Sequence, residues 1–152
     1  MRLTRMSCCR DTGFEFMSRT SEKIYIQARG EREEYTMLNI IQFNSTRKRM
    51  TVVLQNPDGS VTAYSKGADN VMEELLSQES RERDWASCEE DLHEFAKDGL
   101  RTLVLCQRDL EPSWFEGWAK RFEEAETSLD DRDEKVGLRP EGVAGAKAHT
   151  CM

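Results

Sequence analysis

The sequence predicts one α+β domain, an antiparallel sheet of about six strands with helices packed on it. Within the first 67 residues, some stretches alternate apolar and polar residues and others are rich in β-forming residues, which is typical of strands. After that point they recur mainly at every third or fourth position, which is typical of amphipathic helices. Strands that precede helices, instead of alternating with them, favour an α+β fold. A length of 152 residues is that of a single domain.

Six stretches are expected to form strands. The first two alternate apolar and polar residues on either side of the sequence TSE, which predicts a hairpin. The sequence NPDG at 56–59 predicts a tight turn, because proline presets one φ angle and glycine permits a positive φ. The expected strands cover residues 13–19, 23–28, 35–43, 49–55, 60–67 and 100–110.

Three helices are expected after residue 67. A short one covers 68–76, with acidic residues suited to its early turns. A longer one begins near residue 81, with Ser80 available as its N-cap and Gly99 at its C-terminal end. A third has Pro112 near its first turn. The apolar stripes of the two longer helices consist of Trp85, Cys88, Leu92 and Phe95, and of Phe115, Trp118, Phe122 and Ala125.

Composition limits the class of protein. A net charge of -7 and an isoelectric point near 5.0 argue against a general nucleic-acid binder, which neutralises phosphates with lysine and arginine. No run approaches the roughly 20 apolar residues of a membrane span. Five cysteines without a CxxC pair indicate free thiols, and the absence of a signal peptide makes a cytosolic location the default. Residues 131–152, rich in charge, Gly and Ala, are expected to be a disordered tail.

Most catalytic and metal-binding patterns are missing from the sequence. His93 and His149 stand alone, without ligands at metal-binding spacing, so His93 is interpreted as a solvated helix residue. There is no GxSxG, HExxH, GxxxxGKS/T or GxGxxG motif. The acidic clusters EREE, EED and EEAE are interpreted as solvated surfaces. No catalytic residue and no metal ligand is therefore assigned.

The segment FNSTRKRM (43–50) combines an aromatic ring with three cations. Phe43 offers the ring, and in a β conformation Arg47 and Arg49 would share its face while Lys48 would point away. Taken alone, the segment is better explained as a core phenylalanine beside a charged strand edge, because surface charges need no special explanation.

Two further segments carry single cations at the ends of expected strands. Lys66 precedes Gly67 at a strand-to-helix junction, where glycine lets a ligand approach the backbone. Arg101 follows a helix-ending glycine at the start of the last strand. Together with Phe43, these cations have the composition of a nucleotide pocket that lacks a P-loop, because stacking and charge-assisted hydrogen bonds suffice to bind a nucleotide.

The three segments, in this order, resemble a known family. FNSTRKRM, SKGADNVM and DGLRTLVLCQRDL look like the nucleotide-binding (N) domain of P-type ATPases, and the wording is most similar to the phospholipid-transporting branch, the flippases. The resemblance extends over residues 11–130 and leaves residues 1–10 as a divergent N-terminus. It implies that Phe43 stacks on adenine, that Lys66 lines the pocket of base and ribose, and that Arg101 reaches toward the phosphates. Further candidates in the same motifs are Asn44, Arg47 and Gly67.

The resemblance also implies what a complete pump contains. Its ligand would be ATP with Mg²⁺, and its other parts would be a phosphorylation domain with a DKTGT loop, an actuator domain with a DGET motif and a membrane domain. None of these is present in this sequence, and MRLTRMSCCRDT replaces the family's SPDEAALV stretch. We therefore expect an isolated or truncated soluble N domain, such as a partial gene model would give, from the cytoplasmic side of a membrane protein. It is expected to bind adenine nucleotide without turning it over alone.

Two other classes of function stay open. A non-catalytic interaction module would use the apolar helix stripes and the acidic surface for a partner and keep only a vestigial pocket. A small enzyme of another type is less favoured, because no pair of nucleophile and base can be named. Nucleotide titration separates the interaction module from the N domain. An exposed apolar surface would favour a fragment of a larger domain.

Overall fold

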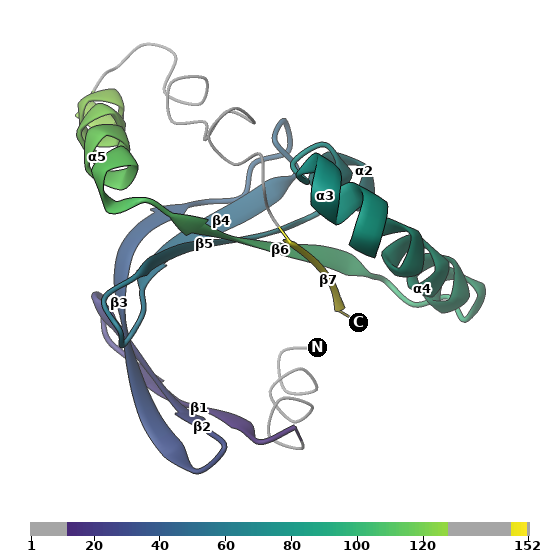
Figure 1. Ribbon diagram of the computed structural model, residues 1–152, viewed down its shortest axis with the longest axis horizontal. Coiled ribbons are helices and arrows are strands. Elements are labelled where there is room, and N and C mark those ends of the chain that lie inside the picture. Colours follow the sequence, from purple (N-terminus) through teal and green to yellow (C-terminus); the bar gives the residue numbers. More distant parts are fainter. Residues whose placement is uncertain (1–11, 128–146, 152) are drawn as a thin grey trace.

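A computed structural model describes residues 12–127 and 147–151 of the chain (Figure 1). These residues form one seven-stranded sheet whose strands lie in sequence order, each antiparallel to its neighbours. The strands are β1 (Phe14–Arg19), β2 (Lys23–Ala28), β3 (Glu31–Ile41), β4 (Arg49–Gln55), β5 (Val61–Gly67), β6 (Leu103–Leu110) and β7 (Lys147–Cys151). The helices are α2 (Asp69–Glu73), α3 (Gln78–Ser80), α4 (Ala86–Lys97) and α5 (Pro112–Thr127), with a π-helical segment at Arg81–Trp85. The predicted α+β fold is confirmed.

The six expected strands correspond to β1 to β6, and the differences lie at their ends. β3 begins at Glu31 instead of residue 35, because Arg29 and Gly30 form a two-residue hairpin turn with positive φ angles of 51° and 93°. The sequence EREE that follows is wholly polar, so it lacks the alternation that marks a strand. The turn and the main chain, not apolar side chains, define this part of the hairpin.

β7 is a strand that the sequence pattern does not predict. It pairs with β6 from Leu103↔Cys151 to Gln107↔Lys147, inside the region expected to be a disordered tail. Pairing with the open edge of a sheet uses main-chain groups and needs no apolar alternation in the added strand. The remainder of the expected tail and residues 1–10 lie outside the described residues.

One nearly continuous helical run links α3 to α4. Its N-cap is Ser77, whose side chain accepts a hydrogen bond from the Ser80 amide at 3.0 Å. The expectation that Ser80 caps this helix is therefore wrong, and Ser80 is instead a buried residue of the first turn. Gly99 has a φ of 71°, as expected of a glycine that ends a helix.

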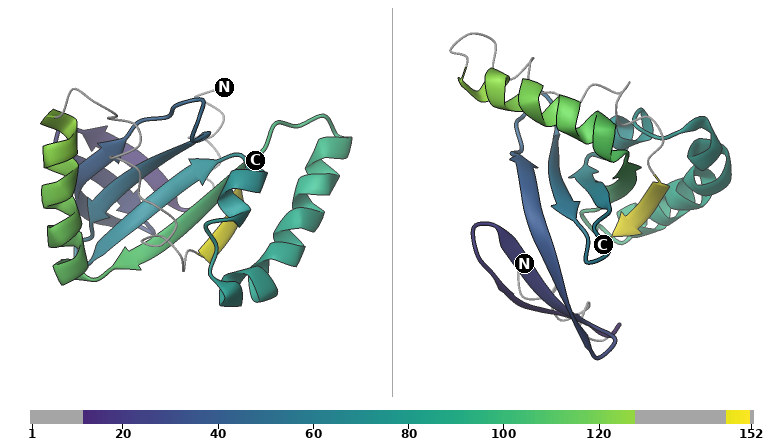
Figure 2. Two further views of the ribbon diagram at one scale, coloured as in Figure 1. Left: turned by 90° about the horizontal axis from the view of Figure 1, so that it is seen from above. Right: turned by 60° about the vertical axis from the view of Figure 1, so that its left-hand side comes forward.

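The helices pack on only one face of the sheet. Successive residues of a strand point to opposite faces, and the strand register assigns the buried apolar residues of β3 to β6 to the same side. This helix-covered face carries Ile41, Val53, Val61, Ala63, Val104, Cys106 and Leu110. Trp118 and Phe122 of α5 pack at one end of the strands, while Met72, Leu76 and Cys88 pack at the other. Figure 2 shows α5 and α4 at these opposite ends.

The other side of the sheet, called here the open face, curves inward (Figure 1). From β3 to β6 its apolar residues are only half-buried, in contrast to the buried residues of the helix-covered face. These residues are Met37, Ile40, Met50, Val52, Leu54, Tyr64 and Leu105. None of the buried clusters to which a described helix contributes contains one of them.

Candidate functional site

The three sequence motifs meet at one end of the sheet. Gly67, at the end of β5, lies opposite Arg49 at the start of β4 and opposite Val104 near the start of β6. The β3–β4 loop with Phe43 and the segment with Arg101 therefore flank the same strand end. The antiparallel register brings together motifs that are far apart in the sequence.

A side-chain-capped turn shapes the β3–β4 loop. The Arg47 amide donates to the Asn44 Oδ1 at 2.6 Å, and the Lys48 amide donates to the Asn44 carbonyl at 2.9 Å. Lys48 has a positive φ of 49°, and the Arg47 guanidinium donates to the Gln42 carbonyl. Residues 44–47 therefore form a turn, and the shared face that a β conformation would give Arg47 and Phe43 does not apply, because an asparagine that binds its own main chain favours a turn.

Phe43 leaves this loop with its ring largely in solvent. Its side chain is 61% exposed, the highest value among the large apolar residues that the structure describes as exposed. An exposed ring adds little to the core of this domain and is accessible to a molecule outside the described chain.

Lys66 and Gly67 occupy the end of β5 with different environments. Lys66 is exposed, and strand alternation places it on the open face, opposite Met50 and Leu105. Gly67 is buried, and a Cβ atom there would lie 2.7 Å from the Lys48 carbonyl oxygen. The Ala68 amide donates to the same carbonyl at 3.3 Å. This geometry gives Gly67 a packing role, since the β3–β4 loop rests directly on its backbone.

Arg101 enters the site from the end of α4. The amides of Gly99 and Leu100 donate to the carbonyls of Ala96 and Phe95, both at 3.0 Å, and so close the helix. Arg101 follows this cap and precedes β6, with an exposed side chain. The cap fixes the point at which the chain turns back to the sheet, and it therefore fixes the position of the Arg101 backbone.

Arg47 and Arg49 bring positive charge to this end of the sheet, although the net charge of the chain is -7. Burial lowers the pKa of Arg49, and the nearby positive charge of Arg47 lowers it further, while Glu74 acts in the opposite direction. Lys66 and Arg101 add two more cations at the same strand ends. A phosphate group placed here would meet favourable charge from several sides.

Asn44 also presents an unused donor. Its Nδ2 atom is buried and has no hydrogen-bond partner among the described residues. A buried donor without a partner costs about 1–3 kcal/mol. An acceptor atom on a ligand would remove that penalty, so the residues present fit a polar ligand held beside the loop.

The hollows described on the surface lie elsewhere. One lies between α5 and β3, and two lie along β3 on the open face, around Tyr35. None of these three hollows is lined by Phe43, Lys66 or Arg101. The exposed side chains of Phe43, Lys66 and Arg101 lie at the strand ends, outside these three hollows, and we call this site the ledge.

Comparison with known proteins identifies the family. Residues 17–138 match the family model described as "P-type ATPase, cytoplasmic domain N". The chain belongs to the P-type ATPase family. This N domain is similar to the human "Probable phospholipid-transporting ATPase IM", with 41% identity over 131 residues, or 86% of this chain and 11% of the relative.

Relatives in other kingdoms give the same result. The N domain is 41% identical over 128 residues to phospholipid-transporting ATPase DRS2 of Saccharomyces cerevisiae, covering 83% of this chain and 9% of that protein. It is 41% identical over 131 residues to phospholipid-transporting ATPase 10 of Arabidopsis thaliana, covering 82% and 11%. The resemblance stated from the three motifs is confirmed, and the chain corresponds to a small part of its relatives. Being an N domain implies ATP as the class of ligand.

Two structural features of this N domain were not predicted from the motifs. Arg49 lies across from Gly67 on the helix-covered face, and its place follows only from the strand register. The turn role of Asn44 could have been expected, because asparagine three residues before the bonded amide is a common turn signal.

Among residues 12–127 and 147–151, no helix is long and apolar enough to cross a membrane.

Proposed function

We propose that this N domain binds adenine nucleotide at the strand ends where its three motifs meet. The observation that carries the proposal is the convergence of Phe43, Lys66 and Arg101 on one end of the sheet. The exposed ring of Phe43 would stack on the base, and Lys66 would donate to the base or ribose from the open face. Both interactions suit a ledge, because stacking needs only one free face of the ring.

The phosphates would lie toward the cations. Arg101 would reach them from the start of β6, and Arg47 would add charge from the turn. Asn44 would donate its unused Nδ2 hydrogen to a nucleotide oxygen or nitrogen. Gly67 would act indirectly, since its missing side chain allows the loop to sit where it does.

The chain contributes orientation and binding, not bond-making. ATP would supply the γ-phosphoryl group for transfer to an aspartate in a separate domain, with Mg²⁺ neutralising phosphate charge. The described residues contain no group of three His, Cys, Asp or Glu side chains that could hold a metal ion. Phe43, Lys66 and Arg101 would hold the nucleotide in the orientation that transfer requires, which is a large share of the catalysis in such reactions. We expect no turnover by this chain alone.

The function of the whole pump is a further part of the proposal. The relatives are named phospholipid-transporting ATPases, and this chain would be the N domain of such a pump, on the cytoplasmic side of a membrane. Its partners would then be the phosphorylation domain and the membrane domain.

Isothermal titration with ATP and with GTP tests the proposal. Phe43→Ala and Lys66→Ala should each weaken ATP binding about tenfold or more, because base stacking contributes about 1–3 kcal/mol and hydrogen bonds to charged groups about 1.5–3 kcal/mol. Phe16→Ala and Lys120→Ala are matched controls, since both side chains are exposed and lie on β1 and α5. Equal losses in the controls would refute the assigned site.

A non-catalytic interaction module is the second candidate. Phe14, Phe16 and Met17 are 39%, 44% and 53% exposed on the edge strand β1, which favours contact with another surface. ATP binding that is undetectable in a folded chain would support this candidate over the first.

A further inference from the structure

The open face exposes apolar surface across most strands of the sheet. Val52 and Leu54 of β4 are half-buried there, whereas Val53, between them, is 0% exposed on the helix-covered face. Phe14 and Phe16 extend the same surface onto β1, because they lie opposite Ala28 and Ile26 of β2. No described helix packs on this surface. An exposed apolar surface that spans this many strands indicates that another segment or molecule packs on the open face.

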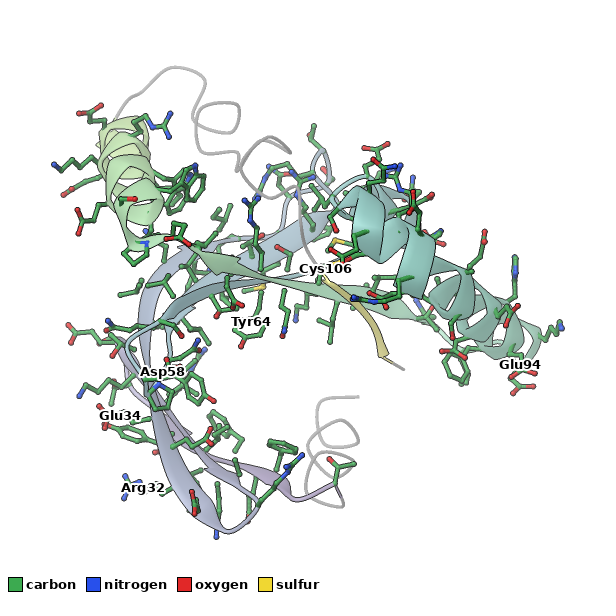
Figure 3. All side chains as sticks on the ribbon, viewed as in Figure 1. Arg32, Glu34, Asp58, Tyr64, Glu94 and Cys106 are labelled. Atoms are coloured by element: carbon green, nitrogen blue, oxygen red, sulfur yellow. The ribbon has the colours of Figure 1, made fainter. Side chains whose placement is uncertain are left out.

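The end of this face that lies away from Lys66 is acidic. A hollow near the β4–β5 turn is lined by three carboxylates and two tyrosines, and its lining contains no Lys or Arg. These residues are Glu33, Asp58, Asp109, Tyr35 and Tyr64. Tyr64 lies inside the curve of the sheet, below β5 (Figure 3). We call this hollow the acidic hollow.

Hydrogen bonds within the acidic hollow leave its negative charge in place. Glu33 accepts from the Tyr35 hydroxyl at 2.6 Å, Asp109 accepts from Thr62 Oγ1 at 2.8 Å, and Asp58 accepts from the Ser60 amide at 2.9 Å. All three donors are neutral, and no ion pair among the described residues includes any of the three carboxylates. The neighbouring hollow on β1 to β3 does contain one cation, Arg29, which lies over the Phe14 ring at 6.0 Å.

The hollow also contains an acceptor without a donor. Asn56 Oδ1 is buried and has no hydrogen-bond partner among the described residues, while its Nδ2 donates to Ser60 and Thr62, both at 2.8 Å. An unpaired acceptor beside three carboxylates favours an occupant rich in N–H donors and positive charge.

The chain itself contains a segment of that chemistry. Residues 1–11 include Arg2, Arg5 and Arg10 but only one acidic residue, together with the apolar residues Leu3 and Met6. They lead directly into β1, at the edge of the open face. The segment 128–146 is a poorer match, because its acidic residues outnumber its basic ones.

The segment 1–11 is also long enough to reach. Eleven extended residues span up to about 36 Å at roughly 3.3 Å each. The five steps from β1 to β6 cover about 24 Å at roughly 4.8 Å per strand. A segment anchored before β1 can therefore cross the face and place its arginines at the acidic hollow.

We propose that residues 1–11 dock on the open face, with their arginines at the acidic hollow and their apolar residues over the half-buried aliphatic side chains. Opposite charges and apolar burial act in the same direction there. The docked segment occupies the acidic end and leaves the Lys66 end accessible. The inference does not depend on nucleotide binding.

Paramagnetic NMR on the full chain tests this docking. A nitroxide is attached to Cys8 in a Cys9→Ser, Cys151→Ser background, in which the remaining thiols, Cys88 and Cys106, are buried. Methyl signals of Val52, Leu54 and Leu105 should broaden several-fold more than those of Val53, Val61 and Val104. The adjacent pair Val52 and Val53 is an internal control, because the two share a strand and differ in face.

Two double variants, each with two carboxylates neutralised, test whether the broadening depends on the acidic hollow. Glu33→Gln with Asp109→Asn should reduce the broadening on the open face several-fold. Glu89→Gln with Glu94→Gln removes the same charge from exposed positions of α4 and should leave the broadening unchanged.

Two results would overturn the proposal. One is equal broadening of the two faces, which would mean that the segment has no preferred site. The other is broadening of equal size when chain that carries only the nitroxide is mixed with chain that carries only the isotopes, which would assign the open face to a second copy of the protein. Circular dichroism of each variant confirms that the sheet has formed.

Discussion

Gly67 of β5 lies opposite Arg49 of β4, and its missing side chain is what allows the β3–β4 loop to rest on the end of the sheet. An added Cβ would lie 2.8 Å from the Arg49 Cβ and 2.7 Å from the Lys48 carbonyl oxygen. The second contact is with backbone, which cannot move aside as the end of a side chain can. The position of Phe43 therefore depends on a glycine two strands away from it.

Gly67→Ala should destabilise the fold and displace the loop. Overpacking of this kind costs about 1–3 kcal/mol. Gly117→Ala is the matched control, because no atom outside its chain neighbours and its own helix backbone lies within 4 Å of its Cβ position, and alanine is favoured over glycine in a helix by roughly 0.5–1 kcal/mol. Urea denaturation should show a loss of stability for the first variant and a small gain for the second. A neutral Gly67→Ala would show that the loop is not held by this contact.

Phe43 and Phe122 should respond oppositely to truncation. Phe43 is 61% exposed, so Phe43→Ala should change the free energy of unfolding by less than about 0.5 kcal/mol. Phe122 is 6% exposed and packs with Trp118 at a ring distance of 4.9 Å, so Phe122→Ala should lose about 3–5 kcal/mol. Thermal or urea unfolding compares the two. A large loss of stability in Phe43→Ala would make its ring part of the core and would argue against a ligand role.

Tyr35 should make stability fall at alkaline pH. Burial, followed by its hydrogen bond to Glu33, raises the pKa of Tyr35 to about 12 from an ordinary value of 10.0. The folded state then keeps the proton longer than the unfolded state, so this stabilisation is complete below pH 10 and is lost as the pH rises toward 12. Unfolding midpoints measured across this range should fall less steeply for Tyr35→Phe than for the native chain. Identical slopes would contradict the assignment.

The buried thiols should resist modification in the folded chain. Burial raises the pKa of Cys106 to about 12, and the neighbouring Cys88 adds to the rise. Thiolate is the reactive form, so alkylation of Cys106 at neutral pH should proceed only when the domain opens. Mass spectrometry after iodoacetamide treatment, with and without urea, measures this. Comparable labelling of Cys106 in both samples would place it outside a stable core.

Much of the fold follows from short-range sequence signals. The alternation in β1 and β2, the β-rich composition of β4 and the apolar stripe of α5 predict the elements, and Gly99 predicts the end of α4. Apolar periodicity does not predict the conformation where the residues of a turn determine it. Asn44 forms a turn between the two strands through its own side chain, and the Arg29–Gly30 turn extends β3 through a polar segment.

The candidate site was predictable in its residues but not in its shape. The motifs name Phe43, Lys66 and Arg101, while only the register shows that they share one end of the sheet. The packing of Gly67 against the loop and the unpaired Nδ2 of Asn44 depend on contacts between distant residues, which no local pattern contains.

Chemical-shift mapping with ATP is the most direct test of nucleotide binding at this site. Binding at the proposed ledge should give saturable shifts in the amides of residues 43–48, 66–68 and 101–103, with smaller shifts near the β4–β5 turn at the opposite end. GTP should bind more weakly. A folded protein that shows no saturable shifts, or whose shifts centre on the acidic hollow, would contradict the assignment.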